Sequence, residues 1–169
     1  MKITSQEASK LLKQYNEQLS YVQNTESKSN YFLAALGEDP ESVRPKYDYE
    51  ETQATIQSLS TTIRKIKHTI NVFNTTTIIP GFDMTIDEML VYIPQLTHQK
   101  DKLWNMMNRL PKVRETGRGY LKNPIIDYNY ANYDIEKAKA DYDIVVERLS
   151  AAQTALDLIN STQAMELVI

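Results

Sequence analysis

Basic and tyrosine side chains gather in one stretch of this 169-residue sequence, residues 109–133. Arginine offers a planar pair of donors that suits phosphate oxygens, while tyrosine offers a ring for stacking on a nucleobase and a hydroxyl for hydrogen bonding. These residue types therefore predict a site for a small anionic ligand of the nucleotide type. The candidate ligand-binding residues in this stretch are Arg109, Lys112, Arg114, Arg118, Tyr120, Tyr128 and Tyr130.

A second polar run, Asn74, Thr75 and Thr76, follows a long apolar repeat and would add an amide and short hydroxyls to the site. Both groups also have a simpler interpretation. The basic stretch is consistent with a solvated loop, and its tyrosines with the packing of a small sheet on a helical bundle. A run of threonines is typical of a helix end, because threonine is a poor residue inside a helix. The sequence leaves both interpretations open.

No pattern for catalysis or metal binding is present. The chain has no cysteine, which excludes disulfides and thiolate ligands, and its two histidines, His68 and His98, form no HExxH motif. No serine lies in a GxSxG or SxxK motif, and "GRGYLK" is not a phosphate-binding P-loop. We therefore expect a protein that is not an enzyme and that holds no metal and no cofactor.

Charge and hydropathy narrow the class of partner. The net charge of −3 argues against binding of long nucleic acids, whereas the stretch 109–122 carries five basic residues and one acidic residue, Glu115. No run approaches ~18–20 apolar residues, so we expect no membrane-spanning helix. The N-terminal residues lack the apolar core of a signal peptide. A cytoplasmic protein is the resulting expectation.

Capping signals and heptad repeats predict four helices. The first begins at Thr4, with Glu7 in a capping box, and runs to Gly37. The second begins after Asp48 and fades in the threonine run. The apolar seam of this second helix consists of Ile56, Leu59, Ile63, Ile66, Ile70 and Phe73.

The other two helices follow the same rules. Thr85 and Glu88 form a second capping box, and Pro94 should kink the third helix or break its first turns before Pro111 marks its end. The fourth begins near Asp134. Its seam consists of Ala138, Tyr142, Val145, Leu149, Ala152, Leu156 and Ile159.

The predicted fold is mainly α: a single domain over residues 1–169, arranged as an elongated antiparallel helical bundle. Alternating residues near 125–133 predict a short strand, and "ELVI" at the C-terminus is a second strand candidate that would pair with it or with a partner chain. Long coiled-coil seams often continue into neighbouring subunits, so we expect a homo-oligomer.

Several segments together resemble a septicolysin-like family of small helical bacterial and phage proteins: "IRKIKHTINVFNTTTIIPGFDMTIDEMLVYIPQL", "RLPKVR", "IIDYNYANYDIEKAKADY" and "QTALDLINST". The resemblance spans residues 45–162 and implies a helical protein of the bacterial cytoplasm, of bacterial or phage origin, with no catalytic role to carry over. The positions typical of the family are Asn71, Asn74, Thr75, Arg109, Lys112, Arg114, Tyr128, Tyr130 and Asn160.

These observations lead to two functional hypotheses. In the first, the protein binds a nucleotide-type immune signal, such as a cyclic oligonucleotide or an ADP-ribose derivative, without cleaving it, and so acts as a phage anti-defence sponge. Such binding needs only cationic and aromatic groups, which are present. In the second, the chain is a structural or protein-interaction module that docks on a host or self partner through its helical seams.

Overall fold

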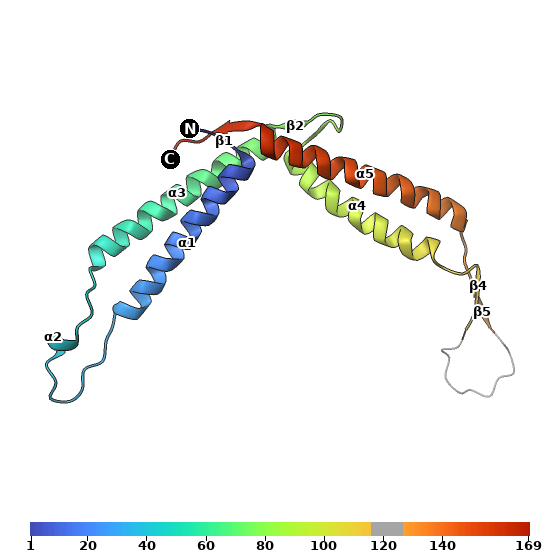
Figure 1. The fold of residues 1–169 in the computed structure, drawn as a ribbon. Helices are drawn as coiled ribbons and strands as arrows, with labels where there is room; N and C mark the ends of the chain where they lie inside the picture. The colour runs from blue at the N-terminus through green and yellow to red at the C-terminus, as the bar shows by residue number, and fades with distance from the viewer. Residues whose placement is uncertain (116–126) are drawn as a thin grey trace, which may run out of the picture. The chain divides into compact units, whose positions relative to one another are not determined.

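The computed structural model describes residues 1–115 and 127–169. The protein is mainly α, as the sequence predicts, and its helices are long. The chain forms two compact units, one of residues 1–77 with 158–169 and the other of residues 78–157. A pair of long helices lies side by side in each unit (Figure 1). The single elongated bundle stays a prediction.

The first unit consists of α1 (Ser5–Ser29) and α3 (Tyr49–Thr76), joined by a connection that contains the short α2 (Pro40–Val43). At the other end of this helix pair, β1 (Lys2–Thr4) pairs antiparallel with β6 (Ala164–Glu166). This pairing brings the two chain ends together, and the N-terminal ammonium donates to the carbonyl of Leu167 at 2.6 Å.

A reciprocal capping box starts α1, as predicted. The Thr4 hydroxyl accepts from the Glu7 amide at 3.2 Å, and the Glu7 carboxylate accepts from the Thr4 amide at 2.8 Å. This hydrogen bond from the Thr4 backbone lowers the pKa of Glu7. The predicted continuation of the helix to Gly37 is wrong: α1 ends at Ser29, and the Asn30 amide makes the last helical bond. Of the apolar residues that follow, Tyr31, Leu33 and Leu36 are exposed, so a helix continued through them would bury little apolar surface.

The start of α3 is also as predicted, because the Asp48 carboxylate accepts from the Glu51 amide at 2.9 Å. The helix includes Thr75 and Thr76 and ends at Thr77, whose amide bonds to the carbonyl of Phe73. Threonine is therefore tolerated in the last turn, where its hydroxyl bonds back to the helix.

The second unit contains α4 (Ile86–Met107) and most of α5 (Ile135–Thr162), whose last residues, 158–162, belong to the first unit. A small antiparallel ribbon of β2 (Ile78–Ile79) and β3 (Met84–Thr85) precedes α4. The connection between α4 and α5 contains the antiparallel pair β4 (Lys112–Arg114) and β5 (Tyr128–Tyr130), which holds the candidate site.

The capping box of α4 is present as predicted, since the Glu88 carboxylate accepts from the Thr85 amide at 2.7 Å. The backbone bond to Thr85 lowers the pKa of Glu88. Pro94 lies inside α4 without ending it, so the helix is not broken in its first turns, and the alternative expectation of a kink stays a prediction. The proline removes one backbone donor, which is a local cost.

The apolar cores contain part of the predicted seams, while the other seam residues, Ile56, Leu59, Ile70, Tyr142 and Leu156, are half-buried. In the first unit the buried apolar residues are Ala8, Ile63, Ile66, Phe73, Ile159, Met165 and Leu167. In the second they are Ile79, Ile86, Met89, Leu96, Leu103, Ala138, Val145, Leu149 and Ala152. The α3 and α5 seams therefore face helices of the same chain.

Side chains from the flanks of the helices also join α4 to α5. The rings of Trp104 and Tyr142 lie 5.6 Å apart. The Arg148 guanidinium lies 5.0 Å from the centre of the Phe82 ring and donates to the Tyr92 hydroxyl at 3.2 Å. These contacts fix the helix pair that carries the candidate site at its end.

The strand expected near 125–133 is present as β5, and the C-terminal strand, β6, covers residues 164–166 and so shares only Glu166 with the expected "ELVI". Of the two pairings expected for the first strand, the one with the C-terminus is wrong, because β5 pairs with β4. Pairing with a partner chain stays a prediction. The C-terminal strand pairs with β1 at the N-terminus. Periodicity indicates that a segment is extended, but it carries no information on which distant segment supplies the partner.

Candidate ligand-binding site

The candidate site is a two-stranded ribbon at the end of the α4–α5 pair (Figure 1). It consists of β4 (Lys112–Arg114) and β5 (Tyr128–Tyr130), with Lys112 opposite Tyr130 and Arg114 opposite Tyr128. The Glu115 amide donates to the Asp127 carbonyl at 2.9 Å and extends the ladder by one more bond. Residues 116–126, which join the strands, lie outside the described part of the chain.

The strand register places four predicted site residues on one face of this ribbon. Directly opposed residues of an antiparallel pair share a face, and alternate residues along one strand do too. The residues Lys112, Arg114, Tyr128 and Tyr130 therefore lie on one side, which we call the cationic face. All four are exposed, Tyr130 to 65%. The sequence predicted these residues as a group, but it did not predict the strand that aligns them.

Contacts within the cationic face hold its groups close together. The Lys112 ammonium lies 4.0 Å from the centre of the Tyr128 ring and 5.4 Å from that of Tyr130. The two rings are 6.5 Å apart and tilted by 52°. A cation over an aromatic ring is attracted by the negative charge of the ring face. One side of each ring is thus in contact with lysine, and this places positive charge beside the two phenol groups.

The opposite face of the ribbon has a different character. Val113, Glu115, Asp127 and Asn129 alternate with the cationic residues, and the Asn129 amide donates to the Glu115 carboxylate. The acidic residues therefore lie on the reverse side of the ribbon from Lys112 and Arg114. This segregation of charge makes only one face attractive to an anion.

The base of the ribbon is attached to the end of α4. The Tyr133 hydroxyl donates to the carbonyl of Met106 at 2.8 Å, and the Ala131 amide donates to the carbonyl of Pro111 at 3.0 Å. Tyr133 is half-buried, unlike the tyrosines of the cationic face. These bonds position the ribbon on a rigid helix end, which favours a defined arrangement of its side chains.

The remaining predicted residues are in three places. Arg109 is exposed next to the C-terminal end of α4, and its amide bonds to the carbonyl of Met106. Arg118 and Tyr120 lie outside the described residues. Asn74, Thr75 and Thr76 belong to the first unit, in the last turn of α3, so the structure does not group them with the cationic face.

The two threonine hydroxyls have hydrogen-bond partners within their own helix. The Thr75 hydroxyl donates to the carbonyl of Asn71 at 3.0 Å, and that of Thr76 to the carbonyl of Val72 at 2.7 Å. These are the local bonds expected where threonine lies at a helix end. They agree with the simpler interpretation of the run, and a ligand role for these residues stays a prediction.

Three shallow grooves lie along the helices of the first unit, with volumes of about 680, 470 and 730 Å³. The first and third are each lined by one carboxylate, Glu17, which Lys13 balances in the first. In the second, Glu26 accepts from the Tyr47 hydroxyl at 2.9 Å and from the Gln53 amide, and Asp48 and Glu51 lie nearby. Burial, followed by the bond to Glu26, raises the pKa of Tyr47. The three carboxylates of the second groove outnumber its one lysine and repel anions, so this groove is a poor site for the predicted ligand.

Within residues 1–115 and 127–169, no three His, Cys, Asp or Glu side chains lie together as a metal site would require. No helix in the same residues is both long enough and apolar enough to cross a membrane. The segregated charges of the β4–β5 ribbon are therefore the feature on which a binding function is best argued.

Comparison with known proteins places the fold and leaves the function open. No family model and no curated protein matches the sequence. The structure is similar to the crystal structure of a functionally unknown conserved protein from Corynebacterium diphtheriae, with a TM-score of 0.60 and 15% identity. The match covers 98% of this chain and 100% of that one, so the two proteins share a fold. The resemblance to a septicolysin-like family stays a prediction.

Proposed function

We propose that this chain is a non-enzymatic binding protein that sequesters a small anionic ligand of the nucleotide type on the cationic face of the β4–β5 ribbon. The observation that carries the proposal is the shared face of Lys112, Arg114, Tyr128 and Tyr130. Two cations would bind phosphate oxygens, the guanidinium through two parallel hydrogen bonds. The phenol groups would donate to further oxygens, and the exposed ring of Tyr130 would stack on a base.

Binding without turnover is the chemistry that these groups favour. Arginine, lysine and tyrosine side chains bind phosphate oxygens and bases, whereas hydrolysis of a phosphate ester needs an activated water or a nucleophile. The carboxylates nearest in sequence, Glu115 and Asp127, lie on the reverse face of the ribbon. The choice between a cyclic oligonucleotide and an ADP-ribose derivative depends on side chains other than the four of the cationic face. If the chain is encoded by a phage, sequestering such an immune signal would make it an anti-defence sponge.

The experiment is a thermal-melt screen of the purified chain against cyclic di- and trinucleotides, ADP-ribose derivatives and ordinary nucleotides. A ligand at about 100 times its dissociation constant stabilises the fold by ~2.7 kcal/mol. For a chain of this size the melting temperature should then rise by roughly 5–10 °C. Arg114→Ala should abolish the rise, and Lys139→Ala, a change of an exposed cation on α5, should leave it intact. If no nucleotide raises the melting temperature, the proposal is wrong.

A protein-interaction function is the second candidate, because the connection between α1 and α3 exposes large apolar side chains, among them Tyr31, Leu33 and Leu36. Docking through the helical seams stays a prediction, since some seam residues are buried within their unit and others are half-buried. The connection offers a partner a further surface.

A further inference from the structure

The connection between α1 and α3 presents apolar side chains to solvent from a fixed backbone. We call residues 31–44 the tip loop. Tyr31 is 79% exposed, Leu33 92%, and Leu36 is fully exposed. These three apolar side chains lie within six positions of the chain, and exposed apolar groups bordered by charged residues are typical of surfaces that bind another protein.

Several bonds hold the backbone of the tip loop. The Glu38 carboxylate accepts from the Ala35 amide at 2.9 Å, and the Glu38 amide donates back to the Ala35 carbonyl at 3.0 Å. Gly37 has a φ of +88°, a conformation that glycine adopts without the strain of a side chain. The loop is thus ordered before any partner binds, which lowers the entropic cost of docking.

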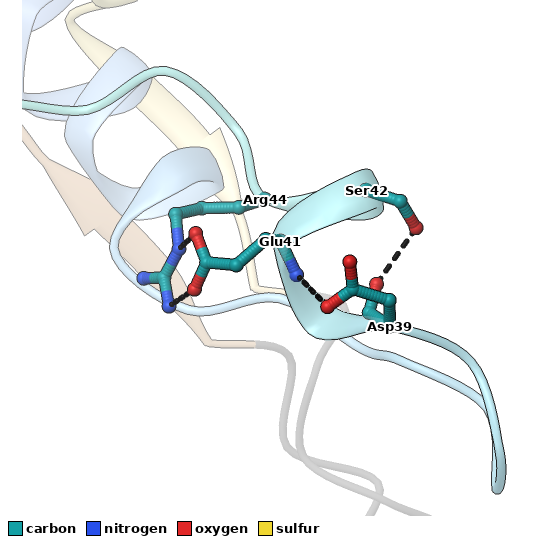
Figure 2. Close-up of polar contacts among 4 residues, drawn as sticks. All are labelled: Asp39, Glu41, Ser42 and Arg44. Carbon is teal, nitrogen blue, oxygen red and sulfur yellow. Dashed lines mark hydrogen bonds and ion pairs between the residues drawn. The ribbon is translucent and has the colours of Figure 1, made fainter.

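The second half of the loop is held by charged side chains, as Figure 2 shows. The Asp39 carboxylate accepts from the Glu41 amide, and the Arg44 guanidinium binds the Glu41 carboxylate through two bonds of 2.6 and 2.8 Å. The same guanidinium lies 5.1 Å from the centre of the Phe32 ring. Arg44 is therefore engaged, and the residues beside Leu36 that keep a negative charge are Glu38 and Asp39.

The charge around the tip loop indicates the chemistry of its partner. Residues 38–51 carry six acidic and two basic residues. A complementary surface is basic and offers exposed aromatic rings for the leucines to cover. The cationic face of the β4–β5 ribbon has these properties, since it combines Lys112 and Arg114 with two exposed tyrosine rings.

We propose that the tip loop of one copy of this chain docks on the cationic face of a second copy. Leu33 and Leu36 would pack on the tyrosine rings, while Glu38 and Asp39 would lie against Lys112 and Arg114. The contact joins two different surfaces, so the assembly is head-to-tail. It needs no nucleotide and goes beyond the proposed function, although a nucleotide on the same face would compete with it.

The test uses two variants of the full chain and sedimentation over a range of concentrations. Leu33→Ser/Leu36→Ser disables the tip loop and leaves the cationic face intact. Lys112→Glu/Arg114→Glu disables the face and leaves the tip loop intact. Wild type should self-associate. For each variant alone, the dissociation constant of self-association should rise by about tenfold or more, because contacts at the centre of the interface are lost. A mixture of the two should form a heterodimer, because each supplies the surface that the other lacks.

Controls separate this contact from a loss of folding. Leu90→Ser, at a half-exposed leucine of α4, should leave association unchanged, and circular dichroism melts should show that all variants fold. Glu38→Gln/Asp39→Asn keeps the oxygen atoms that accept within the loop and removes two charges, so its association should be weaker and less sensitive to salt.

The inference is overturned if wild type is monomeric at every concentration, or if the mixed variants form no heterodimer. The fate of the proposed function is read separately from the melt screen. If no nucleotide binds but the protein self-associates, only the proposed function is wrong. If the protein is monomeric but binds a nucleotide, only the docking proposal is wrong.

Discussion

The two units place opposite chemistry on the connections at the ends of similar helix pairs. The connection of α1 and α3 is acidic and exposes leucine side chains, and the described part of the connection of α4 and α5 carries a basic face with tyrosines. Each is fixed by its own hydrogen bonds, through Glu38 and Arg44 in one and Tyr133 in the other. In both units the buried apolar residues lie mainly on the long helices. The two connections therefore differ from each other in charge and residue type, although each joins a pair of long helices.

The largest loss of stability is expected for substitutions in the helices, compared with substitutions in the tip loop. Ile66 is completely buried on α3, so Ile66→Ala should lower the free energy of unfolding by ~2–5 kcal/mol. Leu33→Ala removes a similar side chain at an exposed position. In dilute monomeric protein it should change the free energy of unfolding by less than about 0.5 kcal/mol. Urea denaturation followed by circular dichroism measures both. Equal losses would mean that the tip loop is part of a core.

A smaller effect tests how the ribbon is attached. Tyr133→Phe removes the hydroxyl that donates to Met106, and should cost about 0.5–1.5 kcal/mol. Hydrogen exchange should quicken at the Ala131 amide while the amides of α1 and α3 stay protected. Tyr142→Phe is the matched control, because its ring contact with Trp104 does not use a hydroxyl. Unchanged exchange at Ala131 would show that the ribbon is held by other contacts.

The smallest effect concerns pH and the tip loop. The hydrogen bond from Arg44 lowers the pKa of Glu41 below its ordinary value of 4.5. A depressed carboxyl pKa gives a stabilisation that is present above the ordinary value and is lost as the pH falls through the folded value. The NMR signal of the Arg44 Nε–H should therefore shift below about pH 4.5. Glu41→Gln should remove this transition, and its persistence in that variant would assign it to another carboxyl.

Local signals predicted the helix bodies well, because capping and burial act on neighbouring residues. Thr4, Asp48 and Thr85 cap their helices as their sequence contexts indicate, and Ile63, Ile66 and Val145 are buried at heptad positions. The error at residues 30–37 has a physical cause. Apolar residues at helical spacing favour a helix only where another surface covers them, and no surface covers Leu33 or Leu36.

The candidate site was predictable in composition and not in geometry. Lys112, Arg114, Tyr128 and Tyr130 were identified from residue type, and their common face depends on a strand pairing between residues up to 18 positions apart. Alternation at 128–130 was visible in the sequence, but the three residues of β4 are too few to indicate a strand. The first half of the tip loop is not predictable from the sequence pattern, because its apolar residues follow those of α1 at helical spacing and only burial distinguishes a helix from a loop there.

Binding of an anionic nucleotide-type ligand by the cationic face can be observed residue by residue, in an NMR titration of the isotope-labelled chain with a cyclic trinucleotide and with ADP-ribose. We expect one of them to shift the amide signals of residues 112–114 and 128–130 in a saturable way, with the α1 and α3 signals unchanged. Saturable shifts along the grooves of α1, or none on the ribbon with either ligand, would contradict this expectation.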